Sequence, residues 1–307
     1  MTMNFIKLKL NTKMVAIVFA TALFCSCGDK PKVNETTTSG DDLPDNDTVK
    51  AVALNVEGHL FSIPSPLQTS LLIKKSGVSY DKAILNAGNK NGQYTSDYSK
   101  ALNLGVYGAD LGYVSMYNQT QDALSYLGAV KQLADKLGVT AAFDQSIMKR
   151  INDNISNKDS MLMLVGIAYR ASDAYLKTNK RIEISSLILT GGWIESMHFS
   201  IAAYKVKPTE EIKYRIAEQK QALGSIIKLV TSHNLPASTE LMTQLMDLAK
   251  VYENITSKYN FIEPTIDEAK KITYINSTTE ITISKEQIEQ IAEKVLAIRN
   301  KIINAKS

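Results

Sequence analysis

Five charged or titratable side chains interrupt otherwise apolar stretches and are the residues best suited to chemistry: Asp110, Arg170, Asp173, Glu195 and His198. A charge in such a stretch is costly to bury unless it is paired or neutral, so each group is expected to have a partner. Asp173 follows Arg170 by three residues, which places both on one helical face, and Asp110 is the alternative partner of Arg170. We interpret the set first as structural ion pairs and, alternatively, as a ligand-binding or acid–base cluster.

Glu195 and His198 are separated by two residues, which brings a carboxylate and an imidazole onto one helical face. Di-iron helical bundles use this Glu-x-x-His spacing, but on two helices and with two further glutamates. The sequence contains one such motif, so we predict no metal ligand and no cofactor. The two residues are then either an acid–base pair or a polar contact satisfied in the core.

The only tryptophan, Trp193, follows Gly191 and Gly192 and completes the set of candidate ligand-binding residues. One hypothesis is that the two glycines kink the helix and leave a notch for a ligand beside the indole ring. The alternative, which we favour, is close packing of two helices, which glycine permits because it has no Cβ atom.

Hydrophobic periodicity predicts an all-α fold, either a multi-helix bundle or a helical-hairpin array of about nine helices. This helical domain is expected to span residues 51–307. The expected helices begin near Pro66 and otherwise cover 95–117, 120–137, 143–155, 158–178, 182–205, 209–233, 238–258 and 284–305. Residues 271–284 follow a different alternation and predict a small β-hairpin.

Three stretches within these helices are apolar on every face: 101–117, 161–176 and 184–204. A helix of this kind belongs at the centre of a bundle, so all three are expected to be buried. Gly105, Gly108 and Gly112 recur at three- and four-residue spacing along the first stretch. They predict the close approach of a neighbouring backbone on that side.

Tyrosine is concentrated in one part of the chain, since six of the fourteen fall between Tyr94 and Tyr126. Tyrosine combines a large apolar ring with a polar tip, which suits protein interfaces and surfaces that stack against sugars. Packing of partly buried helices explains the same enrichment, and both interpretations stand at this point.

Composition argues against several classes of protein. The HExxH, GxSxG, P-loop and GxGxxG motifs are all absent, so no catalytic residue is predicted. The formal charge of +4 includes three lysines near the amino terminus, and the remainder of the chain is nearly neutral. We therefore expect no nucleic-acid partner. The two cysteines lie close together at positions 25 and 27, so no disulfide is expected within the helical domain.

The amino terminus has the organisation of a secretory signal: Lys7, Lys9 and Lys13 precede an apolar stretch from Met14 to Phe24, followed by Cys25-Ser26-Cys27-Gly28. This pattern resembles the lipobox of Gram-negative bacterial lipoproteins. The resemblance implies a signal peptide at 1–26 and lipidation of Cys27, because a small residue, Ser26, precedes it, whereas Phe24 precedes Cys25. An ordinary cleaved signal and an uncleaved anchor are the alternatives.

The same resemblance implies a location and a membrane attachment. Acyl chains on Cys27 would anchor the protein stably to a bilayer. Gly28, in place of the aspartate that retains such proteins on the inner membrane, implies the outer membrane, facing either the periplasm or the exterior. Residues 27–50 are rich in acids and threonine and lack aromatics, which predicts a disordered tether. Within it, Asp47-Thr48-Val49 resembles the acceptor of bacterial O-glycosylation, as does Asp159-Ser160-Met161, with Thr48 the better candidate.

Three hypotheses of function follow. The leading one is a lipid-anchored, non-catalytic helical domain that binds an envelope protein or a small ligand. The second is an envelope enzyme in which Asp110, Asp173, Glu195 and His198 converge on a solvent-reachable cavity. The third is a metal- or haem-handling helical bundle similar to the imelysins, although their Gly-x-His-x-x-Glu motif is absent. The helical part carries no motif of a named family.

Overall fold

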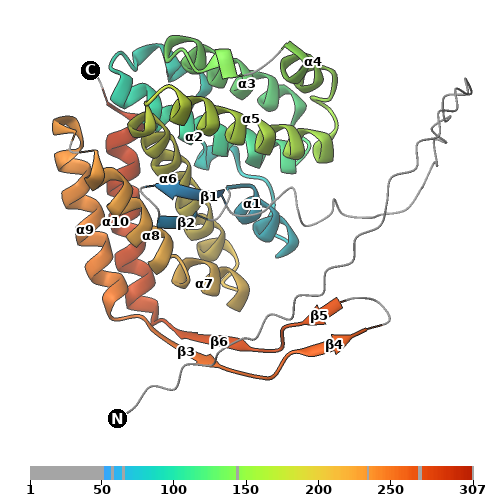
Figure 1. The fold of residues 1–307 in the computed structure, drawn as a ribbon, viewed down its shortest axis with the longest axis vertical. Helices are drawn as coiled ribbons and strands as arrows, with labels where there is room; N and C mark the ends of the chain where they lie inside the picture. The colour runs from blue at the N-terminus through green and yellow to red at the C-terminus, as the bar shows by residue number, and fades with distance from the viewer. Residues whose placement is uncertain are drawn as a thin grey trace, which may run out of the picture. The chain divides into compact units, whose positions relative to one another are not determined.

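Helices dominate the fold, as the sequence predicts (Figure 1). The structure is a computed structural model and describes residues 52–56, 59–63, 66–142, 145–233, 235–268 and 272–305. The predicted signal peptide (1–26), Cys27 and Thr48 lie outside these ranges. Ten α-helices lie in the described part: α1 (Pro66–Lys75), α2 (Asp97–Met116), α3 (Thr120–Lys136), α4 (Gln145–Asp153), α5 (Lys158–Thr178), α6 (Ile182–Val206), α7 (Glu210–Ala217), α8 (Lys220–Ser232), α9 (Thr239–Glu253) and α10 (Lys285–Ile303).

The strands that the structure describes form three antiparallel two-stranded ribbons. They pair β1 (Val52–Val56) with β2 (His59–Ile63), β3 (Thr256–Asn260) with β6 (Thr278–Thr282), and β4 (Thr265–Asp267) with β5 (Ile272–Tyr274). The last two ribbons follow each other along one long hairpin, residues 256–282, which we call the β-arm (Figure 1). The hairpin expected near 271–284 is therefore present, but it starts earlier, because the helix expected to reach 258 ends at Glu253.

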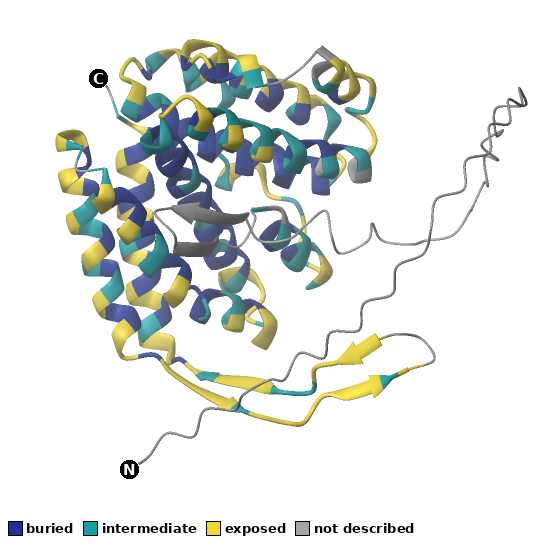
Figure 2. Cartoon of the chain, in the orientation of Figure 1, coloured by how far each residue is buried: buried dark blue, intermediate teal, exposed yellow. Residues whose placement is uncertain are grey.

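Helices α2 and α6 form the centre of the bundle and pack against each other. Every residue from Ala101 to Met116 is buried, and α6 is buried over most of its length (Figure 2). This confirms the expectation for 101–117 and 184–204. The glycines explain how the two helices come so close: a Cβ atom on Gly105 or Gly191 would lie under 3.0 Å from backbone atoms of the facing helix. Helix α6 runs without a break through Gly191 and Gly192, which agrees with the favoured interpretation of close packing and not with a kink.

Helix α5 does not occupy the centre, contrary to the expectation for 161–176. Met161, Leu164 and Val165 are buried on one side, whereas Arg170 and Ala174 are exposed. The physical reason is that α5 packs on α2 and α6 as an outer layer, so only one of its faces is covered. The apolar composition of α5 therefore predicted more burial than the helix has.

Local signals explain several of the helix ends. The Ser96 side chain caps α2 by accepting from the backbone N–H of Ser99, and Gly138 follows α3 with a φ of 67° that favours glycine. The single helix expected over 209–233 is instead two helices, α7 and α8. They separate at Gln219, which is buried and accepts a hydrogen bond from the Trp193 indole N–H at 3.0 Å.

Candidate functional site

Glu195 on α6 and Arg299 on α10 form a buried ion pair. The Nε and Nη2 atoms of Arg299 each donate to a different carboxylate oxygen of Glu195, both at 2.6 Å. The Glu195 side chain has no exposed surface and that of Arg299 is 7% exposed. Two parallel charge-assisted bonds fix the orientation of both groups, so the pair joins the central helix α6 to the last helix of the chain.

Asp110 on α2 is a second, wholly buried carboxyl group beside this pair. Its pKa is raised well above the usual range, first by burial and then by repulsion from Glu195, while Arg299 opposes the rise. Neither carboxyl oxygen of Asp110 has a hydrogen-bond partner among the described residues. The single guanidinium charge of Arg299 balances the charge of Glu195, and the raised pKa of Asp110 favours its neutral form. We call Asp110, Glu195 and Arg299 the buried carboxyl cluster.

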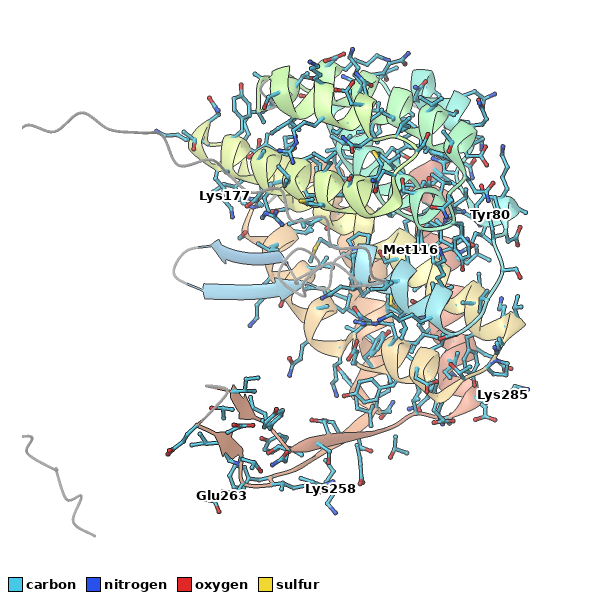
Figure 3. All side chains as sticks on the ribbon, turned by 90° about the vertical axis from the view of Figure 1, so that its right-hand side faces the viewer. Tyr80, Met116, Lys177, Lys258, Glu263 and Lys285 are labelled. Atoms are coloured by element: carbon cyan, nitrogen blue, oxygen red, sulfur yellow. The ribbon has the colours of Figure 1, made fainter. Side chains whose placement is uncertain are left out.

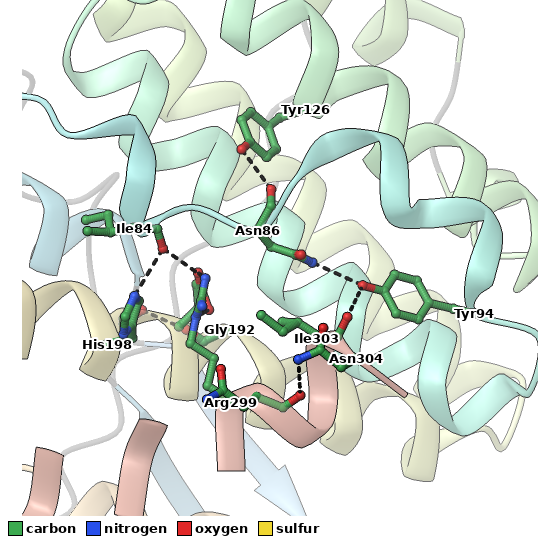
Figure 4. Close-up of polar contacts among 12 residues, drawn as sticks. Ile84, Asn86, Tyr94, Tyr126, Gly192, His198, Arg299, Ile303 and Asn304 are labelled. Carbon is green, nitrogen blue, oxygen red and sulfur yellow. Dashed lines mark hydrogen bonds and ion pairs between the residues drawn. The ribbon is translucent and has the colours of Figure 1, made fainter. Parts of the chain in front are cut away.

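His198 contacts the same region through a backbone carbonyl. Its Nε2 atom lies 3.0 Å from the carbonyl oxygen of Ile84, which also accepts from Arg299 Nη2 at 2.9 Å (Figure 4). Burial is the main cause of a lowered pKa for His198, although Glu195 partly opposes it. The imidazole is therefore neutral at pH 7 and donates from Nε2. Its observed role is to hold the segment around Ile84 against α6.

The tyrosine-rich region extends this polar network to the C-terminal end of α10 (Figure 4). The hydroxyl of Tyr94 donates to the carbonyl of Ile303 at 3.0 Å and accepts from the Asn86 side-chain amide at 3.2 Å. The hydroxyl of Tyr126 donates to the carbonyl of Asn86 at 2.8 Å. Both tyrosines are buried, so at these positions the packing interpretation of the tyrosine enrichment is confirmed.

The ion pair expected between Arg170 and either Asp110 or Asp173 is not formed. Arg170 is exposed on the outer face of α5, whereas Asp110 lies beside Glu195. Asp173 instead accepts from Lys177, one helical turn away, and from the Ser185 hydroxyl, both at 2.6 Å. The prediction was wrong because α5 turns the Arg170 side towards solvent.

Arg299 was not among the site residues predicted from the sequence. It lies on α10, a helix with an ordinary amphipathic pattern in which the apolar positions alone indicate the buried face. The signal that could have found it is its register: Ile288, Ala292, Val295, Arg299 and Ile302 recur at three- and four-residue spacing, so Arg299 lies on the buried face. An arginine in that register requires a buried acid as its partner.

The four residues of the enzyme hypothesis do not converge on one cavity. Asp110 and Glu195 have no exposed surface, His198 contacts a backbone carbonyl, and Asp173 lies elsewhere at the edge of a pocket. Among the described residues, no group of three or more histidines, cysteines, aspartates or glutamates is placed to hold a metal ion. Trp193 is also buried, beside Gln219 rather than beside an open notch.

An apolar pocket of about 80 Å³ is lined by residues of α2, α3, α5 and α6. Its walls include Leu104, Val130, Ala168 and Ile188, and Asp173 and Lys131 are among its few polar residues. Gly108 also lines it, facing Tyr169, whose hydroxyl donates to the carbonyl of Gly105 at 3.2 Å. The pocket is about half the size of the roughly 150 Å³ apolar cavity that accepts benzene, so it suits one small apolar group.

The β-arm is the most exposed apolar region that the structure describes. Seven of the twelve exposed large hydrophobic residues in the described part lie between Tyr259 and Ile275. They include Phe261 at 70% and Ile275 at 80% exposure. Most of its described residues are exposed (Figure 2), and its labelled side chains Lys258 and Glu263 lie at a distance from the helices (Figure 3). Apolar surface concentrated in this way is typical of an interaction site.

No protein-family description, curated protein or solved structure matches the chain. In the described part, no helix combines the length and apolar character needed to cross a bilayer.

Proposed function

We propose that the protein is a lipid-anchored envelope protein whose helical domain presents the β-arm to a protein partner. The observation that carries the proposal is the concentration of exposed apolar side chains on the arm. Catalysis, the alternative, is less well supported, because Asp110 and Glu195 have no surface that a substrate could reach and Asp173 lies apart from them at a different pocket.

The arm offers a partner two kinds of contact. Each of its ribbons has only two strands, so every strand has an outer edge with unpaired backbone groups. A two-stranded ribbon is marginally stable alone in water, and an added strand would complete both its hydrogen bonding and its burial. Near the tip, Tyr274 lies opposite Thr265 and Ile272 opposite Asp267, so apolar and polar residues face one another across the ribbon. The proposed partner therefore supplies an extended strand and an apolar surface.

Charge favours a different protein over a second copy of this chain. Lys258 is the middle residue of β3 and lies opposite Glu280, the middle residue of β6. A symmetric pairing of two β3 edges would place lysine opposite lysine, and a symmetric pairing of two β6 edges would place glutamate opposite glutamate. Pairing of β3 with β6 of another copy avoids this repulsion, but it is a head-to-tail contact that gives rings or filaments and not a two-fold dimer.

Site-specific photocrosslinking in cells tests the partner proposal. A photoreactive residue at Tyr274 should join the full-length protein to one discrete partner, whereas the same residue at Leu124, which is similarly exposed on α3, should not. The substitution I275D in the same chain should abolish the Tyr274 product, and the purified partner should bind the wild-type protein but not the I275D variant. Equal products from Tyr274 and Leu124, or a product made only of two copies of this chain, would contradict the proposal.

Membrane attachment has a separate test. Metabolic labelling with a palmitate analogue should label the wild-type protein and C25S, whereas C27S should remain unlabelled and keep its leader. Labelling that persists in C27S would argue against Cys27 as the anchor. Failure of the lipidation proposal would leave the partner proposal for the β-arm untouched, because the two are tested with different variants and different measurements.

The apolar pocket favours a second, lesser function, the binding of one small apolar group. Benzene or xenon added to the protein should raise its melting temperature, because a ligand that binds the folded state alone stabilises it. The variant A168L, which fills the pocket, should remove the effect. No shift in melting temperature at saturating benzene would exclude this function.

A further inference from the structure

A groove of about 560 Å³ lies between the start of α2, helix α9 and the last turns of α10. Helices α9 and α10 run side by side (Figure 1) and contact each other. The apolar residues Leu102, Leu241 and Ile298, all buried, form its floor. Its volume falls within the range of about 300–1,000 Å³ that small-molecule sites occupy. It shares no lining residue with the β-arm or with the apolar pocket between α3 and α5.

Tyr98 is the one aromatic residue that lines this groove. Burial, followed by the nearby Glu240 carboxylate, raises the pKa of Tyr98 to about 12, so the phenol stays neutral and keeps its proton. No hydrogen bond joins its hydroxyl to another described residue, in contrast to Tyr94 and Tyr126, whose hydroxyls donate to backbone carbonyls. Tyr98 thus combines a ring for stacking with a free hydroxyl.

Three of the polar residues along the groove carry side-chain amides: Gln244, Asn300 and Asn304. The side chains of Gln244 and Asn300 line it, and neither amide is hydrogen-bonded within the described part of the chain. Each amide offers both a donor and an acceptor. The two charged residues of the groove, Glu240 and Lys301, form an ion pair with each other, so the groove carries no net charge.

From this combination we propose that the groove binds a neutral saccharide. Sugar hydroxyls both donate and accept, which matches amide side chains, and the C–H face of a sugar ring packs on an aromatic ring and an apolar floor. The internal ion pair leaves no unpaired charge for a phosphate or another ion. An extended peptide fits less well, because the groove walls are helices whose backbone groups are already paired, so no strand edge is open to it. This site is independent of the partner proposed for the β-arm.

Saturation-transfer NMR tests the proposal directly. The full-length protein is held in a detergent without sugar, such as lauryldimethylamine oxide, and exposed to glucose, galactose, mannose, N-acetylglucosamine, maltose and cellobiose, with trialanine as the peptide probe. Ring protons of at least one sugar should receive saturation, and trialanine should receive none. The variants Q244A and N300A should each weaken the binding of that sugar by about three- to tenfold, the effect of losing one hydrogen bond.

Control variants distinguish loss of a groove contact from the effect of removing any exposed amide. Q290A on the same helix α10 and N152A on α4 remove exposed amides elsewhere and should leave sugar binding unchanged. Y98F should keep most of the affinity if the ring stacks, whereas Y98A should lose it. N300A keeps the test valid if Y98A does not fold, because Asn300 is exposed. Saturation of no sugar, saturation that Q244A and N300A leave unchanged, or binding of trialanine instead would each overturn the proposal.

Discussion

The helical core and the β-arm differ most in how far they bury their apolar and charged side chains. In the core, α2 is buried on every side from Ala101 to Met116, and even Glu195 and Arg299 are enclosed with their charges paired. In the arm, Phe261 and Ile275 are among the most exposed large hydrophobic residues of the described chain. The comparison teaches that the two regions are built differently: the helical core buries its apolar side chains within the chain, whereas the arm leaves its apolar side chains exposed. If the proposed function holds, stability and recognition are therefore carried by different parts of the molecule.

Breaking the buried ion pair should produce the largest effect on stability. The substitution E195A removes both hydrogen bonds of the buried Arg299 guanidinium to Glu195, and it leaves Asp110, which must then ionise, as the remaining buried carboxyl group of the cluster. We expect a loss of up to about 3–5 kcal/mol in the free energy of unfolding. Urea denaturation followed by far-UV circular dichroism measures this loss. The matched control is E240A, which breaks the exposed pair with Lys301 and should cost less than about 1 kcal/mol. Equal losses in the two variants would show that burial does not decide the strength of these pairs.

Close packing of α2 on α6 should be the next most sensitive feature. The substitution G191A places a Cβ atom against the backbone carbonyl of Leu102, and the helices must separate to admit it. We expect a loss of about 2–4 kcal/mol, measured by the same denaturation. The control is G224A in α8, where a Cβ atom meets nothing within 4 Å. There alanine should stabilise the helix by about 0.5–1 kcal/mol, so the two variants should differ in sign.

These two contacts also show what the sequence could and could not predict. Glycine spacing along 101–117 was enough to predict close helix packing, because spacing along one helix is a local property. The partner of Glu195 was not predictable in the same way, since Arg299 is 104 residues away and the pairing depends on how α10 docks. For the same reason Arg170 was given the wrong partner: periodicity identified its helix, but not which face of α5 the bundle covers.

The arm shows a related limit of local signals. The alternation at 271–284 predicted a hairpin, yet the partner strand β3 was assigned to the end of a helix. Strand pairing is decided by residues on both strands, and in register Ser257 lies opposite Ile281 and Tyr259 opposite Thr279. A polar, exposed strand such as β3 has little periodic signal of its own.

Neutralising Asp110 should have a moderate effect that depends on pH. Its folded-state pKa lies above the unfolded value, so its contribution to stability is full below about pH 4 and is lost as pH rises through the folded pKa. The isosteric D110N cannot ionise, so its stability relative to that of the wild type should rise as the pH is raised from 4 to 8. Thermal unfolding of both proteins across this range measures the difference. A constant difference at all pH values would mean that Asp110 does not titrate in the folded protein.

Removing the β-arm should have the smallest effect on stability and so provides the sharpest test of the comparison. Thr256 and Thr282 are paired across the ribbon, so a short glycine-rich turn can join Ile255 to Ile283, both of which stay buried. The arm has few contacts with the helices, and a shorter loop costs less entropy to close. We expect a change below about 1 kcal/mol in the free energy of unfolding, together with loss of binding to the purified partner. A loss of several kcal/mol would instead mean that the arm belongs to the folding core, and its exposed side chains would then need another explanation than recognition.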